Sequence, residues 1–185
     1  MKKVFLFFAL MLAGLTAGAQ DMTESGAYEK KVVVQYDSVN AQALYVRALE
    51  ALSDWAGSQE KSKLGIDVQD KDNGLVVYKG QLYIGYYKIN VFSGWNVLAD
   101  FTMKIRCKDG RAQFTCTIPS MTFVNNPNAS VSETAVMGNL IPEYKHKHWL
   151  KVKKAALQYA PAVPDIVDGI IKKLSDKIRT DGDDF

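Results

Sequence analysis

The stretch MKIRCKDGRAQFTCTI, residues 103–118, decides the fold of this 185-residue chain. Asp109 and Gly110 are a strong turn signal between two runs in which apolar and polar residues alternate. If they form a two-residue turn, Lys108 faces Arg111 and the pairing continues outward from that pair. Because side chains alternate with a period of two, the pairing separates an apolar face from a polar one. The stretch therefore predicts an antiparallel sheet with one face in the core.

The two predicted faces differ in chemistry. One carries the apolar residues Ala99, Phe101, Met103, Ile105, Cys107, Ala112, Phe114, Cys116 and Ile118. The other carries the polar residues Asp100, Thr102, Lys104, Arg106, Arg111, Gln113, Thr115 and Thr117. The polar face is one of the surfaces on which we expect a partner to bind, with Lys104 and Arg106 as candidate binding residues.

This register also places the two cysteines. Cys107 and Cys116 both point into the predicted core, but the residue opposite Cys116 is Met103, four residues from Cys107 along the ladder. At roughly 3.3 Å per residue this separation is about 13 Å, whereas the Cα atoms of a disulfide lie within roughly 7 Å. The sequence therefore predicts two free, buried thiols and no disulfide.

The segments before this hairpin predict one helix and further strands. A Val-rich run ending at Asp37 is typical of a first strand. A helix should follow, capped by Asn40 or Ser38 and stopped by Gly57. The residues 70–74 form a turn signal that favours a hairpin, and the strand-like run QLYIGYYKINVF follows it. The apolar stripe of the helix consists of Ala41, Leu44, Ala48, Ala51, Leu52 and Trp55.

The segment after the hairpin predicts a long connection and then helices. Residues 119–147 lack sustained periodicity, so we expect a partner-facing connection that extends the last strand through Thr122 to Val124. Helical spacing returns over residues 148–159, and a stronger apolar stripe runs from Val163 to Ile178. These elements predict a single α+β domain over residues 21–180, with a frayed tail at 181–185.

The first 20 residues have the pattern of a secretory signal peptide. Two lysines precede an apolar run from Val4 to Leu15, and small residues follow it. This run is shorter than the roughly 20 residues that a spanning helix needs, and no later stretch is longer. We therefore expect an exported chain, periplasmic or extracellular, cleaved near Ala19 and Gln20 and soluble, with no transmembrane segment after cleavage.

The charge balance argues against nucleic acid as a partner. The formal net charge is +3, from 23 Lys and Arg against 20 Asp and Glu. Removal of residues 1–20 takes away Lys2 and Lys3 and no acid, which leaves 21 − 20 = +1. Nucleic-acid binding normally requires a strongly basic surface, so we expect no nucleic-acid partner.

Three stretches carry a resemblance to a known family. They are ALYVRALEALSDWA, GIDVQDKDNGLVVYKG and MKIRCKDGRAQFTCTI. The chain resembles, over about residues 29 to 120, a family of exported proteins described as a domain of unknown function with a TATA-binding-protein-like (TBP-like) fold. The resemblance implies a curved antiparallel sheet with helices packed on one face. It implies no reaction, and the fold alone does not imply DNA binding.

Two short motifs resemble metal-binding sites, but each lacks ligands that such a site needs. His146 and His148 would share a face of an extended segment, but a zinc site needs three or four ligands, and lysines crowd this stretch. The residues 70–74 resemble the start of a calcium loop, but the glycine comes one position early and Gln81 stands where the closing Glu belongs. We expect no metal and no cofactor.

Two further groups of residues are candidate binding surfaces. The aromatic set Tyr83, Tyr86, Tyr87, Phe92 and Trp95 suits stacking against a sugar or a peptide, with Tyr87 and Trp95 as the candidate residues. Strand alternation puts Tyr86 and Tyr87 on opposite faces, so part of this set must belong to the core. The basic run Lys145, Lys147, Lys151, Lys153 and Lys154 suits an acidic surface such as lipopolysaccharide phosphates, with the last three as candidates.

The functional hypothesis follows from export, a stable core and the lack of a recognisable catalytic motif. We expect a non-enzymatic binding or interaction module of the cell envelope, whose partner is an envelope protein or a glycan, and we assign no catalytic residue. The alternative is an exported hydrolase acting on glycan or peptide. Clustered acidic residues with shifted pKa values in a deep cleft would favour the alternative.

Overall fold

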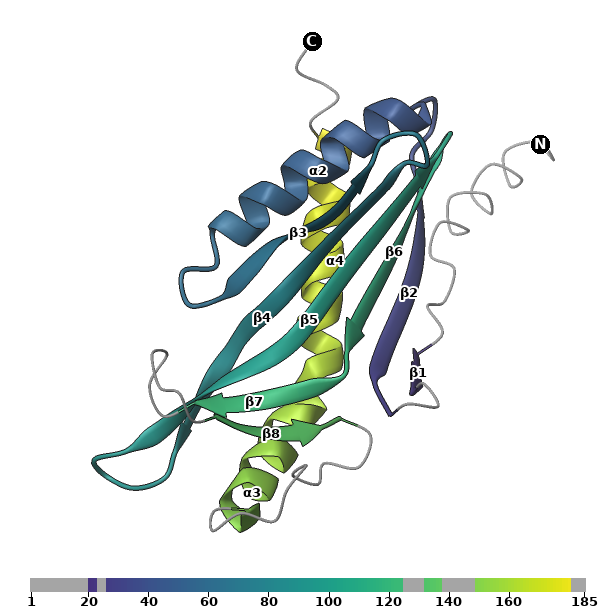
Figure 1. Ribbon diagram of the computed structural model, residues 1–185. Helices are drawn as coiled ribbons and strands as arrows, with labels where there is room; N and C mark the ends of the chain where they lie inside the picture. The colour runs from purple at the N-terminus through teal and green to yellow at the C-terminus, as the bar shows by residue number, and fades with distance from the viewer. Residues whose placement is uncertain (1–19, 23–25, 125–131, 138–148, 181–185) are drawn as a thin grey trace, which may run out of the picture.

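The computed structural model describes residues 20–22, 26–124, 132–137 and 149–180 (Figure 1). These residues form one antiparallel curved sheet with helices, which confirms the predicted α+β class. The strand order is β1-β2-β6-β5-β4-β3, and β7 pairs with both β5 and β8. The strands are β1 (Gln20–Met22), β2 (Tyr28–Gln35), β3 (Lys63–Asp70), β4 (Leu75–Lys88), β5 (Gly94–Lys108), β6 (Arg111–Ile118), β7 (Ser120–Val124) and β8 (Ser132–Val136). The helices are α2 (Ala41–Gly57), α3 (Trp149–Tyr159) and α4 (Val163–Thr180), with a 3₁₀ turn at Ala160–Ala162 between the last two.

The β5–β6 hairpin has the register that the sequence predicts. Lys108 pairs with Arg111, and Met103 pairs with Cys116. Gly110 adopts φ 70°, a left-handed conformation that glycine reaches without strain. The cysteines are free and buried, at 3% and 0% exposure for Cys107 and Cys116.

Helix α2 begins where its predicted cap lies. The Asn40 side-chain oxygen accepts a hydrogen bond from the Ala43 backbone N–H at 2.8 Å, so Asn40 and not Ser38 is the N-cap. The Asp109 carboxylate accepts a second bond from the Ala41 N–H, also at 2.8 Å. The turn of the β5–β6 hairpin therefore fixes the start of α2.

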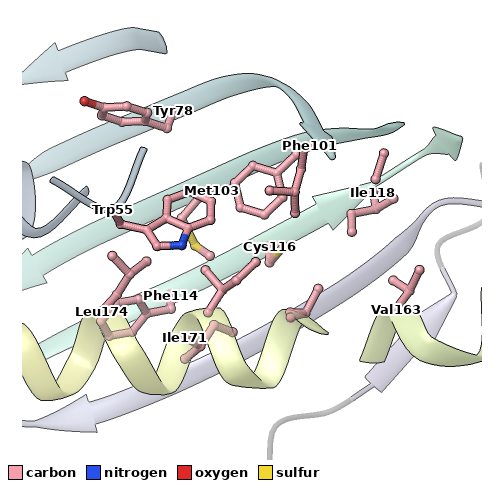
Figure 2. Packing of buried hydrophobic residues seen from close by; sticks show 14 of the residues in the cluster. Trp55, Tyr78, Phe101, Met103, Phe114, Cys116, Ile118, Val163, Ile171 and Leu174 are labelled. Atoms are coloured by element: carbon pink, nitrogen blue, oxygen red, sulfur yellow. The ribbon is translucent and has the colours of Figure 1, made fainter. Parts of the chain in front are cut away.

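The core lies between one face of the sheet and the helices α2 and α4. Figure 2 shows Trp55 of α2 and Leu174 of α4 directed toward the apolar side chains of the sheet. The ring centroids of Trp55 and Phe101 lie 5.4 Å apart, and Phe114 is fully buried. One ion pair, between Lys177 of α4 and Asp54 of α2, also joins the two helices. Both helices thus cover the same face of the sheet.

The opposite face of the sheet has no helix packed on it within the described residues, and Figure 1 shows α4 running behind the strands. We call it the helix-free face. On β5 it consists of the even-numbered residues from Asn96 to Lys108, because the odd-numbered residues point into the core.

Two expectations about strand boundaries are wrong. Leu75 to Lys88 form one strand, where the sequence suggested two, because Gly80 at φ 149° lets the chain stay extended past residues 79–80. The connection after Pro119 contains a strand pair, β7 and β8. The expected extension through Thr122 to Val124 does exist, but it pairs with β5 beyond the end of β6. Pro119 has no N–H for a ladder, which explains the break between β6 and β7.

Several expectations lie outside the described residues. These are residues 1–19 of the signal peptide predicted over residues 1–20, the tail 181–185 and most of the connection after β7, including the histidine pair at 146 and 148. No helix within the described part of the chain is long and apolar enough to cross a membrane.

Candidate binding surface

The helix-free face contains a concavity of about 510 Å³. It lies where the loop after α2, the middle of β4, the start of β5 and the strand β7 meet. It is lined by Glu60, Lys61, Ser62, Lys63, Gln81, Tyr83, Asn96, Leu98, Thr122 and Val124. A volume of this size is within the range of small-molecule sites.

One wall of the concavity comes from the turn between α2 and β3. The Ser62 hydroxyl accepts a hydrogen bond from the Tyr83 backbone N–H at 2.9 Å, which joins this turn to β4. The Lys61 ammonium lies 4.8 Å from the centroid of the Tyr83 ring, a cation–π contact. Gly80 allows the close approach, because a Cβ at this position would lie 1.8 Å from the Lys63 carbonyl oxygen. The turn is thus held against β4 by backbone and side-chain contacts.

The other wall comes from β5 and β7. Asn96 pairs with Val124 and Leu98 pairs with Thr122, so β7 extends the helix-free face beyond the end of β6. Next to the concavity, Asp100 of β5 accepts hydrogen bonds from the Gln81 side-chain amide at 3.3 Å and from the Ser120 hydroxyl. These bonds connect β5 to β4 and to β7. The lining therefore offers one half-buried aromatic ring, several amide and hydroxyl groups, two lysines and one carboxylate.

A second, shallower concavity of about 270 Å³ lies toward the other end of β5 on the same face. It is lined by Val33, Arg106, Lys108, Arg111 and Gln113. Within the described residues, none of its three cations forms an ion pair, and neither does the neighbouring Lys104. Unpaired cations gathered on one surface attract anionic groups, most strongly at low salt.

The structure separates the predicted binding residues into three places. Lys104 and Arg106 lie on the helix-free face, as expected. Tyr87 and Trp95 instead stack on each other at 6.1 Å on the core side of the sheet, and Trp95 is only 6% exposed. These two rings therefore form no exposed stacking platform. The three lysines Lys151, Lys153 and Lys154 are exposed on α3, away from both concavities.

Most residues that line the larger concavity could not be recognised from the sequence. Tyr83 was in the aromatic set, but Asn96, Thr122 and the turn residues 60–63 carry no sequence signal of their own. Their proximity depends on the pairing of β7 with β5 and on the bulge between Tyr83 and Gly85. A strand beyond a proline and a bulge are both long-range outcomes that local patterns do not specify.

Burial shifts the pKa of several groups in the core and at its edge. Burial raises the pKa of the Cys107 and Cys116 thiols to about 12, and it raises the pKa of Tyr28 to about 12. Burial also raises the pKa of Tyr159. Within the described ranges, no group of three or more His, Cys, Asp or Glu residues is arranged to hold a metal ion.

Comparisons with known proteins identify the fold. The family described as "Domain of unknown function (DUF4468) with TBP-like fold" matches residues 31–122. A DUF4468 family protein from Bacteroides ovatus ATCC 8483 has a similar structure, with a TM-score of 0.59 at 11% identity over 86% of this chain and 90% of that chain. A TBP-like protein from Parabacteroides distasonis ATCC 8503 has a TM-score of 0.52 at 10% identity, over 84% and 97%. A search of curated proteins gave no significant match.

Proposed function

From the premise that the chain belongs to the DUF4468 family, a family with a TBP-like fold and no assigned function, we propose that it is a non-enzymatic binding module of the cell envelope. Its ligand is an acidic glycan, and its binding site is the helix-free face. The observation that carries this proposal is the concavity of about 510 Å³ around Tyr83, on the same face as a cluster of unpaired cations.

The larger concavity supports a sugar ligand through the chemistry of its lining. A sugar ring offers an apolar face and a rim of hydroxyl groups. Tyr83 provides an aromatic surface for the first, and the amides of Gln81 and Asn96 provide donors and acceptors for the second. Lys61 and Lys63 add positive charge at one wall, which favours a ligand with carboxylate or phosphate groups.

The second concavity supports a ligand longer than a single sugar. Asn96 and Arg106 lie ten residues apart on β5, which is about 33 Å at roughly 3.3 Å per residue. An extended acidic chain lying along the strand would reach from the Tyr83 site to Arg106 and Lys108. Its charged groups would then contact cations that have no partner in the described protein.

The lining of the larger concavity favours binding over hydrolysis. Glycoside hydrolysis commonly uses a pair of carboxyl groups placed on either side of the scissile bond. Glu60 is the single carboxylate among the described lining residues, so the concavity lacks such a pair. If the experiment described next shows hydrolysis of the glycan, a hydrolase function would replace the proposed binding function.

Isothermal titration calorimetry on the chain expressed from Gln20 tests the proposal. The ligands are hexagalacturonate, which is acidic, and maltohexaose, which is its neutral counterpart. We expect the acidic ligand to bind and the neutral one to bind at least ten-fold more weakly. Tyr83→Ala should weaken binding roughly ten-fold by removing the stacking surface. Replacing Arg106 and Lys108 by Gln should weaken it by a similar factor or more.

The matched control is Lys172→Gln, which removes an exposed cation from α4 on the other side of the molecule and should leave affinity unchanged. No binding of hexagalacturonate, or equal binding by all variants, would contradict the proposal. New reducing ends appearing in the same samples would favour the hydrolase. Tighter binding of a 20-nucleotide single-stranded DNA would identify a different class of ligand.

Export is a part of this proposal with its own support. Cleavage between Ala19 and Gln20 would leave β1 intact as the first segment of the mature chain, paired with β2. Cell fractionation followed by N-terminal sequencing tests it. We expect the envelope fraction to contain a chain that begins at Gln20 or Asp21. A full-length chain beginning at Met1 in the cytoplasm would contradict export.

A further inference from the structure

The tip of the β4–β5 hairpin presents apolar side chains to solvent. Phe92 is 97% exposed and Val91 is 77% exposed, more than any other large hydrophobic residue among those described. Figure 1 shows this hairpin projecting beyond the rest of the sheet. A single exposed apolar residue is ordinary, but two neighbouring ones at a projecting tip indicate a contact surface.

This tip is held in one conformation by its own hydrogen bonds. The Asn90 side-chain oxygen accepts from the Phe92 backbone N–H at 2.9 Å and from the Ser93 hydroxyl at 3.0 Å. The Ile89 N–H donates to the Ser93 carbonyl oxygen at 3.0 Å. The loop thus keeps Phe92 directed away from the protein, where folding gains nothing from its apolar surface.

Helix α3 presents a second apolar strip, this time among lysines. Leu150 is 57% exposed and Leu157 is 51% exposed, and Lys154 lies between them on the same helical stripe. Lys151 and Lys153 flank this stripe, and the helix contains no acidic residue. The opposite side of α3 is buried through Val152, Ala155 and Ala156. The exposed side of α3 is therefore both basic and apolar.

The tip and α3 belong to one end of the molecule. The Tyr159 hydroxyl at the end of α3 donates to the Tyr86 carbonyl oxygen of β4 at 2.8 Å. In Figure 1 both the hairpin tip and α3 lie at the end of the domain opposite the β5–β6 turn. Residues 86–94 and 149–159 together contain the lysines Lys88, Lys151, Lys153 and Lys154 and no Asp or Glu.

We propose that this end of the molecule binds the surface of an anionic lipid bilayer. Phe92 and Val91 would insert among the upper acyl chains, and Leu150 and Leu157 would contact the boundary below the headgroups. The lysines would bind the lipid phosphates, as long side chains beside an apolar strip commonly do. A bilayer fits better than a protein pocket, because the apolar groups are dispersed among cations and project outward.

Vesicle co-sedimentation of the chain expressed from Gln20 tests this proposal. The vesicles contain phosphatidylcholine with 30% phosphatidylglycerol in one arm and phosphatidylcholine alone in the other. We expect binding to the anionic vesicles that weakens as salt increases, and at least ten-fold weaker binding to the neutral ones. Phe92→Ser should reduce binding to anionic vesicles roughly ten-fold. Replacing Lys151, Lys153 and Lys154 by Gln should reduce it roughly 100-fold.

The controls distinguish binding through this surface from nonspecific hydrophobic adsorption and from binding at the glycan site. Val46→Ser removes an apolar residue that is 43% exposed on α2 and should leave vesicle binding unchanged. Tyr83→Ala should likewise leave it unchanged, because Tyr83 belongs neither to the hairpin tip nor to α3. Inorganic phosphate at millimolar concentration should not displace the protein, since a free anion offers no apolar contact. Equal binding to both vesicle types, no binding at all, or full binding by Phe92→Ser would overturn the proposal.

Discussion

The ring of Tyr159 on α3 lies against Gly85 on β4 so closely that a Cβ atom at residue 85 would come within 2.4 Å of a ring carbon. The same tyrosine donates a hydrogen bond to the neighbouring carbonyl oxygen of Tyr86. Because Gly85 has no side chain, the Tyr159 ring in the last turn of α3 can pack directly against β4. This contact joins the helix with the exposed lysines to the strand that leads to the hairpin tip.

Gly85→Ala should destabilise the fold by roughly 1–3 kcal/mol, because the Tyr159 ring must move away from β4. Tyr159→Phe keeps the ring and loses only the hydrogen bond, which should lower the free energy of unfolding by about 1 kcal/mol. Urea denaturation of both variants measures the difference. A Gly85→Ala variant as stable as the unchanged protein would contradict the close packing of Tyr159 on Gly85.

Gly80→Ala should be more damaging than a glycine substitution elsewhere. Gly80 has φ 149°, and an added Cβ would lie 1.8 Å from the backbone oxygen of Lys63. We expect a loss of roughly 2–4 kcal/mol in the free energy of unfolding, with weaker glycan binding because the wall that carries Lys63 must shift. Gly169→Ala is the matched control, since its Cβ meets nothing within 4 Å. That variant should gain roughly 0.5–1 kcal/mol from helix propensity, and a stable Gly80→Ala protein would contradict the account.

The buried thiols predict a loss of stability at alkaline pH. Burial raises the pKa of Cys107 and Cys116 from the ordinary 9.0 to about 12. Above pH 9 the unfolded chain therefore releases thiol protons that the native chain retains, so the free energy of unfolding falls as pH rises toward 12. Each thiol contributes a slope of up to about 1.4 kcal/mol per pH unit in this range.

Urea denaturation at pH 8 and pH 10 measures this slope. The double variant Cys107→Ala, Cys116→Ala should show a shallower decline, although buried tyrosines such as Tyr28 retain part of it. In the native protein neither thiol should react with Ellman's reagent at pH 8 until denaturant is added, because both are almost fully buried. Rapid reaction of either thiol without denaturant would contradict the register of the β5–β6 hairpin.

Much of the fold could be predicted because its signals are local. The turn at Asp109 and Gly110 fixes the register of its hairpin, and the alternation beside it fixes which face is buried. The cap at Asn40 and the stripe ending at Trp55 likewise define α2 without reference to the rest of the chain. For this hairpin and this helix the sequence and the structure agree.

The candidate site was less predictable because it depends on residues far apart in the chain. Trp95 and Asn96 are neighbours on one strand, yet one is in the core and the other lines a concavity. The sequence placed Trp95 among the surface candidates, because an aromatic-rich strand does not reveal which of its faces meets the helices. The pairing of β7 with β5, which completes the concavity, could not be inferred from residues 119–124 alone.

The most direct test of the central claim is a nuclear magnetic resonance titration of the ¹⁵N-labelled chain, expressed from Gln20, with hexagalacturonate. We predict that the backbone amide signals of Gln81, Tyr83, Asn96 and Thr122 shift on titration, while those of α4 around Ile171 stay in place. Shifts confined to α2 and α4, or an unchanged spectrum at millimolar ligand, would contradict the claim that the helix-free face binds an acidic glycan.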